Sequence, residues 1–437
     1  MYLSPEEDSD GRNSCRGWSP MEVSVVGGGL AGLVAARRLA ERDVDVTLFE
    51  RDGTVGGRVR SDHVDGFVLD RGFQALFTAY PAVQHELDLD ALSLRSFRPG
   101  ATLVRPGERT TLADPLGDPS ALTATLFNRD ITFGDKLRTL RLRRELARKP
   151  LADVLAADDS TIAESLADRG FSEQFRENFA APFYGGITLD RSLSTSRFVF
   201  EYTFKMLAAG KTAVPADGMG AISQQLAATA RDAGVTIETD TPVEAVTVDE
   251  GGGVTVDTSG ETVESDAAIV ATDPTTAREL TGCAIPTDGL GCVTQYFSLP
   301  TTQQFPTSRR LLLNTVDARP NQVALLSDVA PEYAPDRQHL LSATFLGEQE
   351  TSDEELATEV SDALSAWFPE NSFGNLELLR TDRIQFAQVR QPPGFRANRP
   401  AVDDPDGEVY LAGDYMEWSS IQGALESGRR AARAVQR

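Results

Sequence analysis

Cysteine, histidine and long apolar runs are all scarce in this sequence, and each shortage excludes a class of protein. The three cysteines, Cys15, Cys283 and Cys292, are odd in number and form no C-x-x-C pair, so we expect neither a disulfide framework nor a zinc site. The three histidines fall in no metal-ligand or Ser/His/Asp pattern, and we therefore expect no metal. No stretch approaches the ~18 consecutive apolar residues of a membrane-spanning helix.

Positive charge is also in short supply. The sequence holds 66 acidic and 42 basic residues, and its net charge of −24 at pH 7 is spread along the chain. Such a surface repels nucleic acid, so we expect no nucleic-acid partner. The pattern favours a cytoplasm kept at high salt, where screening removes the self-repulsion of a large net charge. The alternative is an ordinary acidic protein from a high-GC genome.

The length indicates more than one hydrophobic core. A single core stops growing near ~250–300 residues, so a chain of 437 residues predicts two domains. Residues 1–20 are polar and acidic and lack the apolar core of a secretory signal. We expect this segment to be a disordered tail, or the product of a start codon upstream of the true Met21.

A glycine-rich turn provides the first functional signal. Residues 22–26 alternate and are rich in valine, which predicts a strand, and residues 30–39 carry apolar side chains at helical spacing. Between them lies the sequence Gly27-x-Gly29-x-x-Gly32, in the position of a dinucleotide-binding turn. In that geometry the helix N-terminus offers its free N–H groups to a pyrophosphate.

An acidic residue indicates which nucleotide this turn would hold. The second predicted strand, residues 44–49, ends at Glu50. A carboxylate at this place accepts hydrogen bonds from the adenosine ribose hydroxyls and repels a 2′-phosphate, which excludes NADP. The fingerprint by itself does not separate NAD from FAD.

Two further segments favour FAD over NAD, because they resemble the motifs of a known family. RDGTVGGRVRS, residues 51–61, follows Glu50, and VYLAGDYMEWSSIQGALESGRRAA occupies residues 409–432. Together with the glycine turn they resemble the FAD-binding motifs of the flavin-containing amine oxidoreductase superfamily, which includes amine oxidases, protoporphyrinogen oxidases and carotenoid desaturases. The resemblance implies FAD, held noncovalently because no cysteine lies near the C-terminal motif.

The resemblance also implies a set of cofactor-binding residues. In the family, the helix that follows the Gly413-Asp414 pair points its N-terminus at the flavin, where it stabilises the negative charge of the reduced ring. The complete set is Gly27, Gly29, Leu30, Ala31, Gly32, Glu50, Arg51, Gly56, Gly57, Arg58, Val243, Ala271, Gly413, Asp414, Gln422 and Ala424.

The resemblance predicts an α/β fold of two interleaved domains. A Rossmann-like FAD-binding domain is expected to alternate along the chain with a substrate domain of mixed sheet and helices. The FAD-binding domain comprises residues 21–73, 205–288 and 398–437, and the substrate domain comprises residues 74–204 and 289–397.

The substrate domain resembles the desaturase and protoporphyrinogen oxidase branch of the family in residues 69–81 and 182–196. These regions and the helix that follows are rich in aromatic residues, which form either a pocket or, more commonly, simple core. The set comprises Phe73, Phe77, Tyr80, Phe183, Tyr184, Phe198, Phe200, Tyr202 and Phe204.

Two departures count against a typical amine oxidase. Where such enzymes place a lysine near flavin N5, residues 291–300 offer Gln295, and of the usual aromatic pair only Trp418 has a match. We therefore predict an enzyme that transfers hydride from a hydrophobic substrate, such as an isoprenoid or carotenoid, to flavin N5. The alternatives are an amine or protoporphyrinogen-type oxidase and, in another class, a non-catalytic flavin-binding scaffold or redox sensor.

One basic segment stands out from the acidic background. Residues Lys136 to Lys149 hold seven basic residues and one acid, with leucines at near-helical spacing. A basic amphipathic helix can lie on an anionic membrane. The alternative is a solvated helix paired with neighbouring acids. The sequence does not indicate the oligomeric state.

Overall fold

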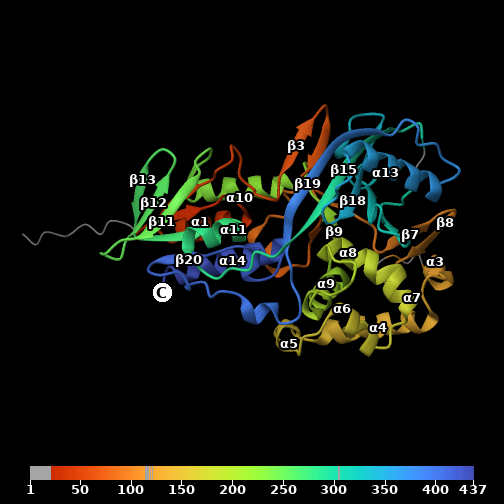
Figure 1. Ribbon diagram of the computed structural model, residues 1–437, viewed down its shortest axis with the longest axis horizontal. Helices are drawn as coiled ribbons and strands as arrows, with labels where there is room; N and C mark the ends of the chain where they lie inside the picture. Colours follow the sequence, from red (N-terminus) through yellow and green to blue (C-terminus); the bar gives the residue numbers. More distant parts are fainter. Residues whose placement is uncertain (1–20, 114–117, 119, 121, 304–305) are drawn as a thin grey trace, which may run out of the picture.

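The protein has the predicted α/β fold, with mixed helices and several sheets (Figure 1). The computed structural model describes residues 21–113, 118, 120, 122–303 and 306–437. The expectations for residues 1–20, Cys15 among them, lie outside the described residues. The division of the chain into two domains at the stated boundaries stays a prediction.

A five-stranded parallel sheet forms one end of the molecule. Its strands come from three distant parts of the sequence, and neighbouring strands pair in the order β10-β2-β1-β14-β20. These strands are β1 (Glu22–Val26), β2 (Asp45–Phe49), β10 (Thr236–Glu238), β14 (Ala267–Val270) and β20 (Val409–Leu411). Because the strands are parallel, their carboxyl ends meet at one edge, which is where ligands bind in open sheets of this kind.

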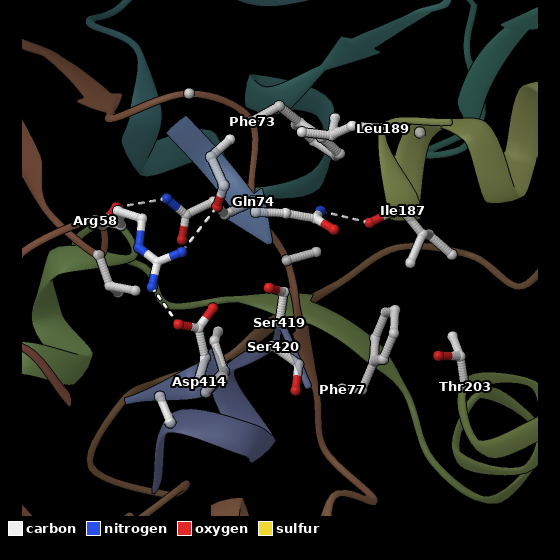
Figure 2. Close-up of a pocket in the computed structure, with 18 of the residues that line it drawn as sticks. Arg58, Phe73, Gln74, Phe77, Ile187, Leu189, Thr203, Asp414, Ser419 and Ser420 are labelled. Carbon is white, nitrogen blue, oxygen red and sulfur yellow. Dashed lines mark hydrogen bonds and ion pairs between the residues drawn. The ribbon is translucent and has the colours of Figure 1, made fainter. Parts of the chain in front are cut away.

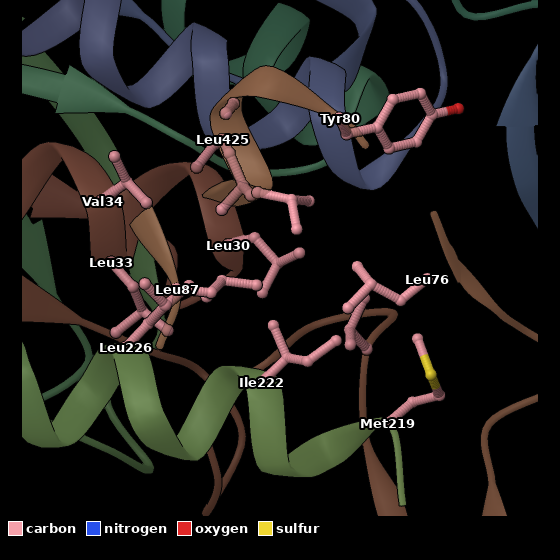
Figure 3. Packing of buried hydrophobic residues seen from close by; sticks show 14 of the residues in the cluster. Leu30, Leu33, Val34, Leu76, Tyr80, Leu87, Met219, Ile222, Leu226 and Leu425 are labelled. Atoms are coloured by element: carbon pink, nitrogen blue, oxygen red, sulfur yellow. The ribbon is translucent and has the colours of Figure 1, made fainter. Parts of the chain in front are cut away.

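Three helices pack together beside this sheet. Helix α1 (Leu30–Ala40) contacts α10 (Gly220–Asp232) and α14 (Ile421–Ala434). Their apolar side chains belong to the largest hydrophobic core, in which Leu33 and Leu226 come from neighbouring helices (Figure 3). A small antiparallel sheet and one more helix complete this end. They are β11 (Val243–Val248), β12 (Val254–Thr258), β13 (Thr262–Ser265) and α11 (Pro274–Thr281).

A mixed seven-stranded sheet forms the other end, in the order β19-β15-β18-β17-β16-β7-β8. Only β7 and β16 pair in parallel, and α13 (Asp353–Trp367) packs on one face through leucine and valine side chains. The strands are β7 (Ala101–Arg105), β8 (Glu108–Leu112), β15 (Gly289–Pro300), β16 (Leu311–Asn314), β17 (Gln322–Leu325), β18 (Gln338–Leu346) and β19 (Glu377–Val389).

A group of helices lies beside the seven-stranded sheet (Figure 1). It comprises α3 (Leu122–Phe127), α4 (Phe133–Arg148), α5 (Leu151–Ala156), α6 (Ile162–Asp168), α7 (Glu173–Phe175), a π-helical turn (Arg176–Ala180), α8 (Ala181–Thr188) and α9 (Arg197–Ala209). Short elements connect the two ends of the molecule. These are β3 (Ser61–Val64), β4 (Phe67–Asp70), β5 (Leu76–Phe77), α2 (Pro81–Glu86), β6 (Arg95–Ser96) and β9 (Thr212–Val214), whereas α12 (Leu326–Val329) joins β17 to β18.

Candidate active site

A cavity of about 1700 Å³ connects the glycine turn with the helices at the other end of the molecule. Its wall begins at Gly27 and Gly29 after β1, passes the strand β19, and reaches α4, α8 and α9. Ligand pockets commonly measure ~300–1,000 Å³. The cavity is therefore large enough for a dinucleotide and a second ligand side by side.

The glycine turn is shaped by close backbone contacts. A side chain at Gly32 would place its Cβ 2.0 Å from the carbonyl oxygen of Gly27, so α1 can start this close to β1 only with glycine there. A Cβ at Gly29, in contrast, would meet nothing within 4 Å and would project into open space where Gly29 lines the cavity. Gly32 therefore serves packing, and Gly29 leaves room for a ligand.

Glu50 is fixed at the end of β2. Its side chain is buried, Oε2 accepts a hydrogen bond of 2.7 Å from the Gly28 amide, and Oε1 accepts one of 2.9 Å from the Asp52 amide. The carboxylate lines the cavity directly beside the glycine turn. This is the placement that recognition of ribose hydroxyls requires.

An ion pair joins the two other motifs across the cavity wall. The Arg58 guanidinium lies 2.5 Å from Asp414 Oδ1 and also donates to the carbonyl oxygen of Ala387 at 2.9 Å (Figure 2). Burial lowers the pKa of Arg58, but the charge and hydrogen bond of Asp414 outweigh burial and raise it overall. Arg58 therefore stays a cation, and Gln74 donates to its carbonyl oxygen.

The N-terminus of α14 faces the cavity. Ser420 caps the helix by accepting a hydrogen bond of 2.9 Å from the Gly423 amide, and Ser419, Ser420 and Ala424 line the wall. Gln422 is different because its side chain is buried and accepts from the Ala82 amide, which ties α14 to α2. Neither Gln422 nor Gly32 lines the cavity, and for both of them a contact with FAD stays a prediction.

The other predicted cofactor-binding residues all lie in the cavity wall. Val243 is the first residue of β11, and the backbone of Ala271, which follows β14, packs against Gly27. The structure therefore brings together motifs separated by several hundred residues. That these residues contact FAD stays a prediction.

Gln295 was expected to border the substrate, and this prediction is wrong. Its side chain is completely buried on the other face of β15, where Nε2 donates to the carbonyl oxygen of Asp353 at 2.8 Å and to Thr381 Oγ1 at 3.1 Å. Side chains alternate between the faces of a strand. Cys292, three positions earlier, therefore faces the cavity, and no described residue of β15 is a lysine.

Cys292 is the only cysteine of the described chain that lines the cavity. Burial, together with the nearby charge of Asp382, raises the pKa of its thiol to about 11. The thiol therefore stays protonated at neutral pH. This protonated side chain stands on β15, the strand on which the amine-oxidase pattern would place an ammonium group.

The aromatic residues divide between cavity and core. Phe73, Phe77, Tyr80, Phe183, Tyr184 and Phe204 line the cavity, whereas Phe198, Phe200 and Tyr202 belong to the core. Trp418 lines the cavity as predicted and packs against Tyr202 with ring centres 4.7 Å apart. Figure 2 shows Phe77 beside Ser420 and Phe73 near Leu189.

Sequence reasoning missed part of the aromatic wall. Phe175 and Phe179 also line the cavity, and together with Phe183 they form a row with ring centres 5.4 and 5.2 Å apart. Their spacing of four residues is the signal that could have revealed them, because residues at i and i+4 lie on one face of a helix.

No histidine of the described residues lines the cavity. His63 and His85 are exposed and His339 is half-buried. Within residues 21–437, leaving out the undescribed positions, no cluster of His, Cys, Asp or Glu could hold a metal ion. In the same part of the chain, no helix combines the length and apolarity needed to cross a membrane.

Similarity to known proteins covers most of the chain. A sequence profile of the flavin containing amine oxidoreductases matches residues 30–436. Protoporphyrinogen oxidase 2 of Arabidopsis thaliana is 29% identical over 175 residues, 38% of this chain and 32% of the relative. Carotenoid phi-ring synthase of Streptomyces griseus is 28% identical over 280 residues, 59% of this chain and 53% of the relative. The matches thus span about a third and about half of these relatives.

A solved structure shows the same fold. Cyclohexylamine oxidase from Brevibacterium oxydans IH-35A superposes with a TM-score of 0.67 at 20% identity, covering 95% of this chain and 99% of the other. Because the family profile matches nearly the whole chain, and because its motifs converge on one large cavity, the protein belongs to the flavin containing amine oxidoreductase family.

Proposed function

We propose that this flavin oxidoreductase binds FAD noncovalently and removes hydride from a carbon of a large hydrophobic substrate, as a desaturase or dehydrogenase. The observation that carries the proposal is the single cavity of about 1700 Å³, which continues from the nucleotide-type turn into a wall of aromatic side chains. Such a wall suits an extended apolar molecule. The names of the relatives make an isoprenoid or carotenoid the first substrate to test.

The residues in the wall fit FAD. Gly29 leaves open space where a pyrophosphate would approach, and Glu50 presents a fixed carboxylate to a ribose. The capped N-terminus of α14 offers a partial positive charge to a reduced ring. No cysteine occurs in residues 409–432, which supports noncovalent binding.

A bound flavin would supply hydride acceptance at its N5 atom. The chain itself positions the substrate and excludes water through aromatic side chains such as Phe77 and Trp418. Gln74 and Gln388 have their amide groups fixed by hydrogen bonds to the carbonyl oxygens of Arg58 and Ile187. These fixed amides line the part of the cavity between the nucleotide-type turn and the aromatic wall, where they can orient a substrate.

The charges of the wall disfavour an amine substrate. Among the described residues that line the cavity, the carboxylates all belong to the nucleotide-type end; they are Glu50, Asp52, Asp273, Glu279 and Asp414. The cations of the far end are Arg98, Lys136, Arg143, Lys211 and Arg309. A protonated amine would meet these positive charges there, whereas the carboxylates of the lining lie at the nucleotide-type end. The same cations favour a second candidate, a protoporphyrinogen-type oxidase, because porphyrinogens with carboxylate side chains would be attracted.

An anaerobic titration tests the proposal. The protein is purified in molar salt, its flavin spectrum is recorded, and the cofactor released by heat is identified. The holoprotein is then titrated without oxygen with phytoene in detergent, with protoporphyrinogen and with a primary aliphatic amine. We expect release of FAD and bleaching of the flavin absorbance by phytoene.

The other outcomes separate the alternatives. Bleaching by protoporphyrinogen alone would establish the second candidate, and bleaching by the amine alone would restore the amine oxidase. A bound flavin that dithionite reduces but no donor bleaches would favour the non-catalytic scaffold. A protein that cannot be loaded with FAD would contradict the proposal from its first step.

A further inference from the structure

Exposed apolar side chains gather on one segment of the described chain. Seven large hydrophobic residues are strongly exposed in the described part of the chain, and four of them lie between positions 126 and 140. These are Leu126, Phe133, Leu137 and Leu140, with exposed fractions of 51%, 64%, 53% and 37%. The other three are scattered valines. Soluble surfaces commonly expose single apolar residues, but a cluster marks an interaction site.

The geometry of α4 holds this cluster outward. Leu142 and Leu146 are buried on one side of the helix, and at 100° per residue Phe133, Leu137 and Leu140 fall on another. Lys136 donates to the carbonyl oxygens of Leu126 (2.8 Å) and Asn128 at the end of α3. This contact fixes Leu126 beside α4, and we call the four exposed residues the α3–α4 face.

The charge around the α3–α4 face is opposite to that of the whole chain. Seven basic residues lie between Lys136 and Lys149 in a protein of net charge −24. Arg141, Arg144 and Arg148 are exposed, and Arg144 lies on the same side of the helix as Phe133 and Leu137. Apolar residues surrounded by arginine match the surface of an anionic bilayer, in which acyl chains lie beneath phosphate groups.

The same helix also forms the far wall of the cavity. Lys136, Leu140 and Arg143 line it, so Leu140 belongs both to the cavity wall and to the exposed face. Arg98 and Arg309 lie nearby, joined through a backbone hydrogen bond of 3.0 Å, and both line the cavity. The cavity therefore reaches the surface next to the apolar cluster.

We propose that the α3–α4 face docks on the surface of an anionic phospholipid bilayer. Phe133 and Leu137 insert among the acyl chains while the arginines contact phosphates. The docking is independent of the proposed function. The further step, in which the hydrophobic substrate passes from the bilayer into the cavity, rests on the proposed function. A second copy of the chain is a poorer occupant, because a two-fold contact through this face would bring two sets of the exposed arginines, Arg141, Arg144 and Arg148, together.

Vesicle flotation tests the docking. The holoprotein is mixed with phosphatidylglycerol vesicles and with phosphatidylcholine vesicles, at several salt concentrations at which circular dichroism shows it folded. We expect binding to phosphatidylglycerol that weakens with salt, and an affinity loss of about tenfold or more in Phe133→Ser/Leu137→Ser. Arg141→Glu/Arg144→Glu should lose the preference for phosphatidylglycerol. Val248→Ser/Val316→Ser, exposed at 42% and 60%, is the matched control and should bind like the wild type.

Several outcomes would overturn the docking. One is a wild-type protein that floats with neither kind of vesicle. Another is a Phe133→Ser/Leu137→Ser variant that still binds vesicles as the wild type does. The third is a wild type that sediments as a dimer without vesicles while this variant sediments as a monomer. Vesicle binding by a protein that no substrate bleaches would uphold the docking and count only against the proposed function.

Discussion

The thiol of Cys292 offers a direct probe of the cavity wall. Burial and the charge of Asp382 raise its pKa to about 11, so at pH 7 almost none of it is the reactive thiolate. We expect iodoacetamide to modify Cys292 slowly at pH 7 and progressively faster as the pH approaches 11. Cys283 is half-buried outside the cavity wall and serves as the internal comparison.

Both cysteines lie in one tryptic peptide, residues 279–309, so tandem mass spectrometry of its fragments is used to measure the label on each thiol. FAD or a long apolar ligand should slow the labelling of Cys292 and leave Cys283 unchanged. Rapid modification of Cys292 at neutral pH would contradict its placement in the wall.

At this scale the sequence predicts chemistry better than orientation. Glu50 and Asp414 could be singled out because Glu50 directly follows β2, Asp414 comes three positions after β20, and each lies in a recognisable motif. Gln295 could not be placed, because β15 is buried on both faces and therefore lacks the alternation of apolar and polar residues that reveals which side chains face which way. If the expected position on a strand is wrong by an odd number of residues, the predicted side chain lies on the opposite face of the sheet.

The turn between β1 and α1 separates two roles of glycine. Gly32→Ala would force its Cβ to within 2.0 Å of the Gly27 carbonyl oxygen and should lower the free energy of unfolding by about 2–3 kcal/mol or more. Gly29→Ala has no such contact and should cost only about 0.5–1 kcal/mol, because Gly29 is the N-cap of α1 and alanine is a poorer N-cap than glycine. Its methyl group projects into the cavity, so it should weaken flavin binding.

Urea unfolding of the two apoproteins and flavin binding followed by fluorescence distinguish these effects. Equal destabilisation by both substitutions would contradict the described turn. Retained flavin affinity in Gly29→Ala would contradict its place beside the cofactor.

The longer helices were predictable, whereas their partners were not. The periodic segments that became α4, α9, α10 and α13 carry their own apolar patterns, so local sequence was sufficient. Packing against distant elements decides which aromatic residues around α9 line the cavity. Phe204 reaches the cavity, whereas Phe198 packs against Trp418, more than two hundred positions away.

Asp70 links parts of the whole molecule through a buried carboxylate. It accepts hydrogen bonds from Ser61 (2.5 Å), from the Met219 amide (2.8 Å) and from the hydroxyl of Tyr333 (3.2 Å). Burial raises its pKa from 3.8 to about 6, against the opposing effect of these hydrogen bonds. The folded state therefore binds this proton more tightly than the unfolded state does. The resulting stability is present below pH 4 and lost as the pH rises through 6.

We predict that the stability of the wild type falls relative to Asp70→Asn by about 2 kcal/mol between pH 4 and pH 7. Urea unfolding of both proteins across this range measures the difference. Asp65→Asn, an exposed position in the turn of the same hairpin, is the control and should give a curve parallel to the wild type. A parallel curve for Asp70→Asn would contradict the raised pKa.

The net charge of −24 makes salt a determinant of global stability. The Debye length shrinks from about 10 Å at 0.1 M salt to about 3 Å at 1 M, which weakens repulsion among surface carboxylates. We therefore expect Tm, measured by differential scanning fluorimetry, to rise with KCl over this range. A Tm that stays constant or falls would contradict the high-salt interpretation of the composition.

The strand order of the five-stranded sheet also determines when, during synthesis of the chain, the sheet can be completed. The sheet cannot be completed until β20 has been synthesised, and α1 cannot bury its apolar side against α14 until residues 421–434 have followed it. Long-range parallel pairing of this kind is slow and leaves apolar edges exposed in the meantime. The nascent chain therefore has the glycine turn of β1 and α1 long before it has the residues after β20 that complete the wall of the cavity.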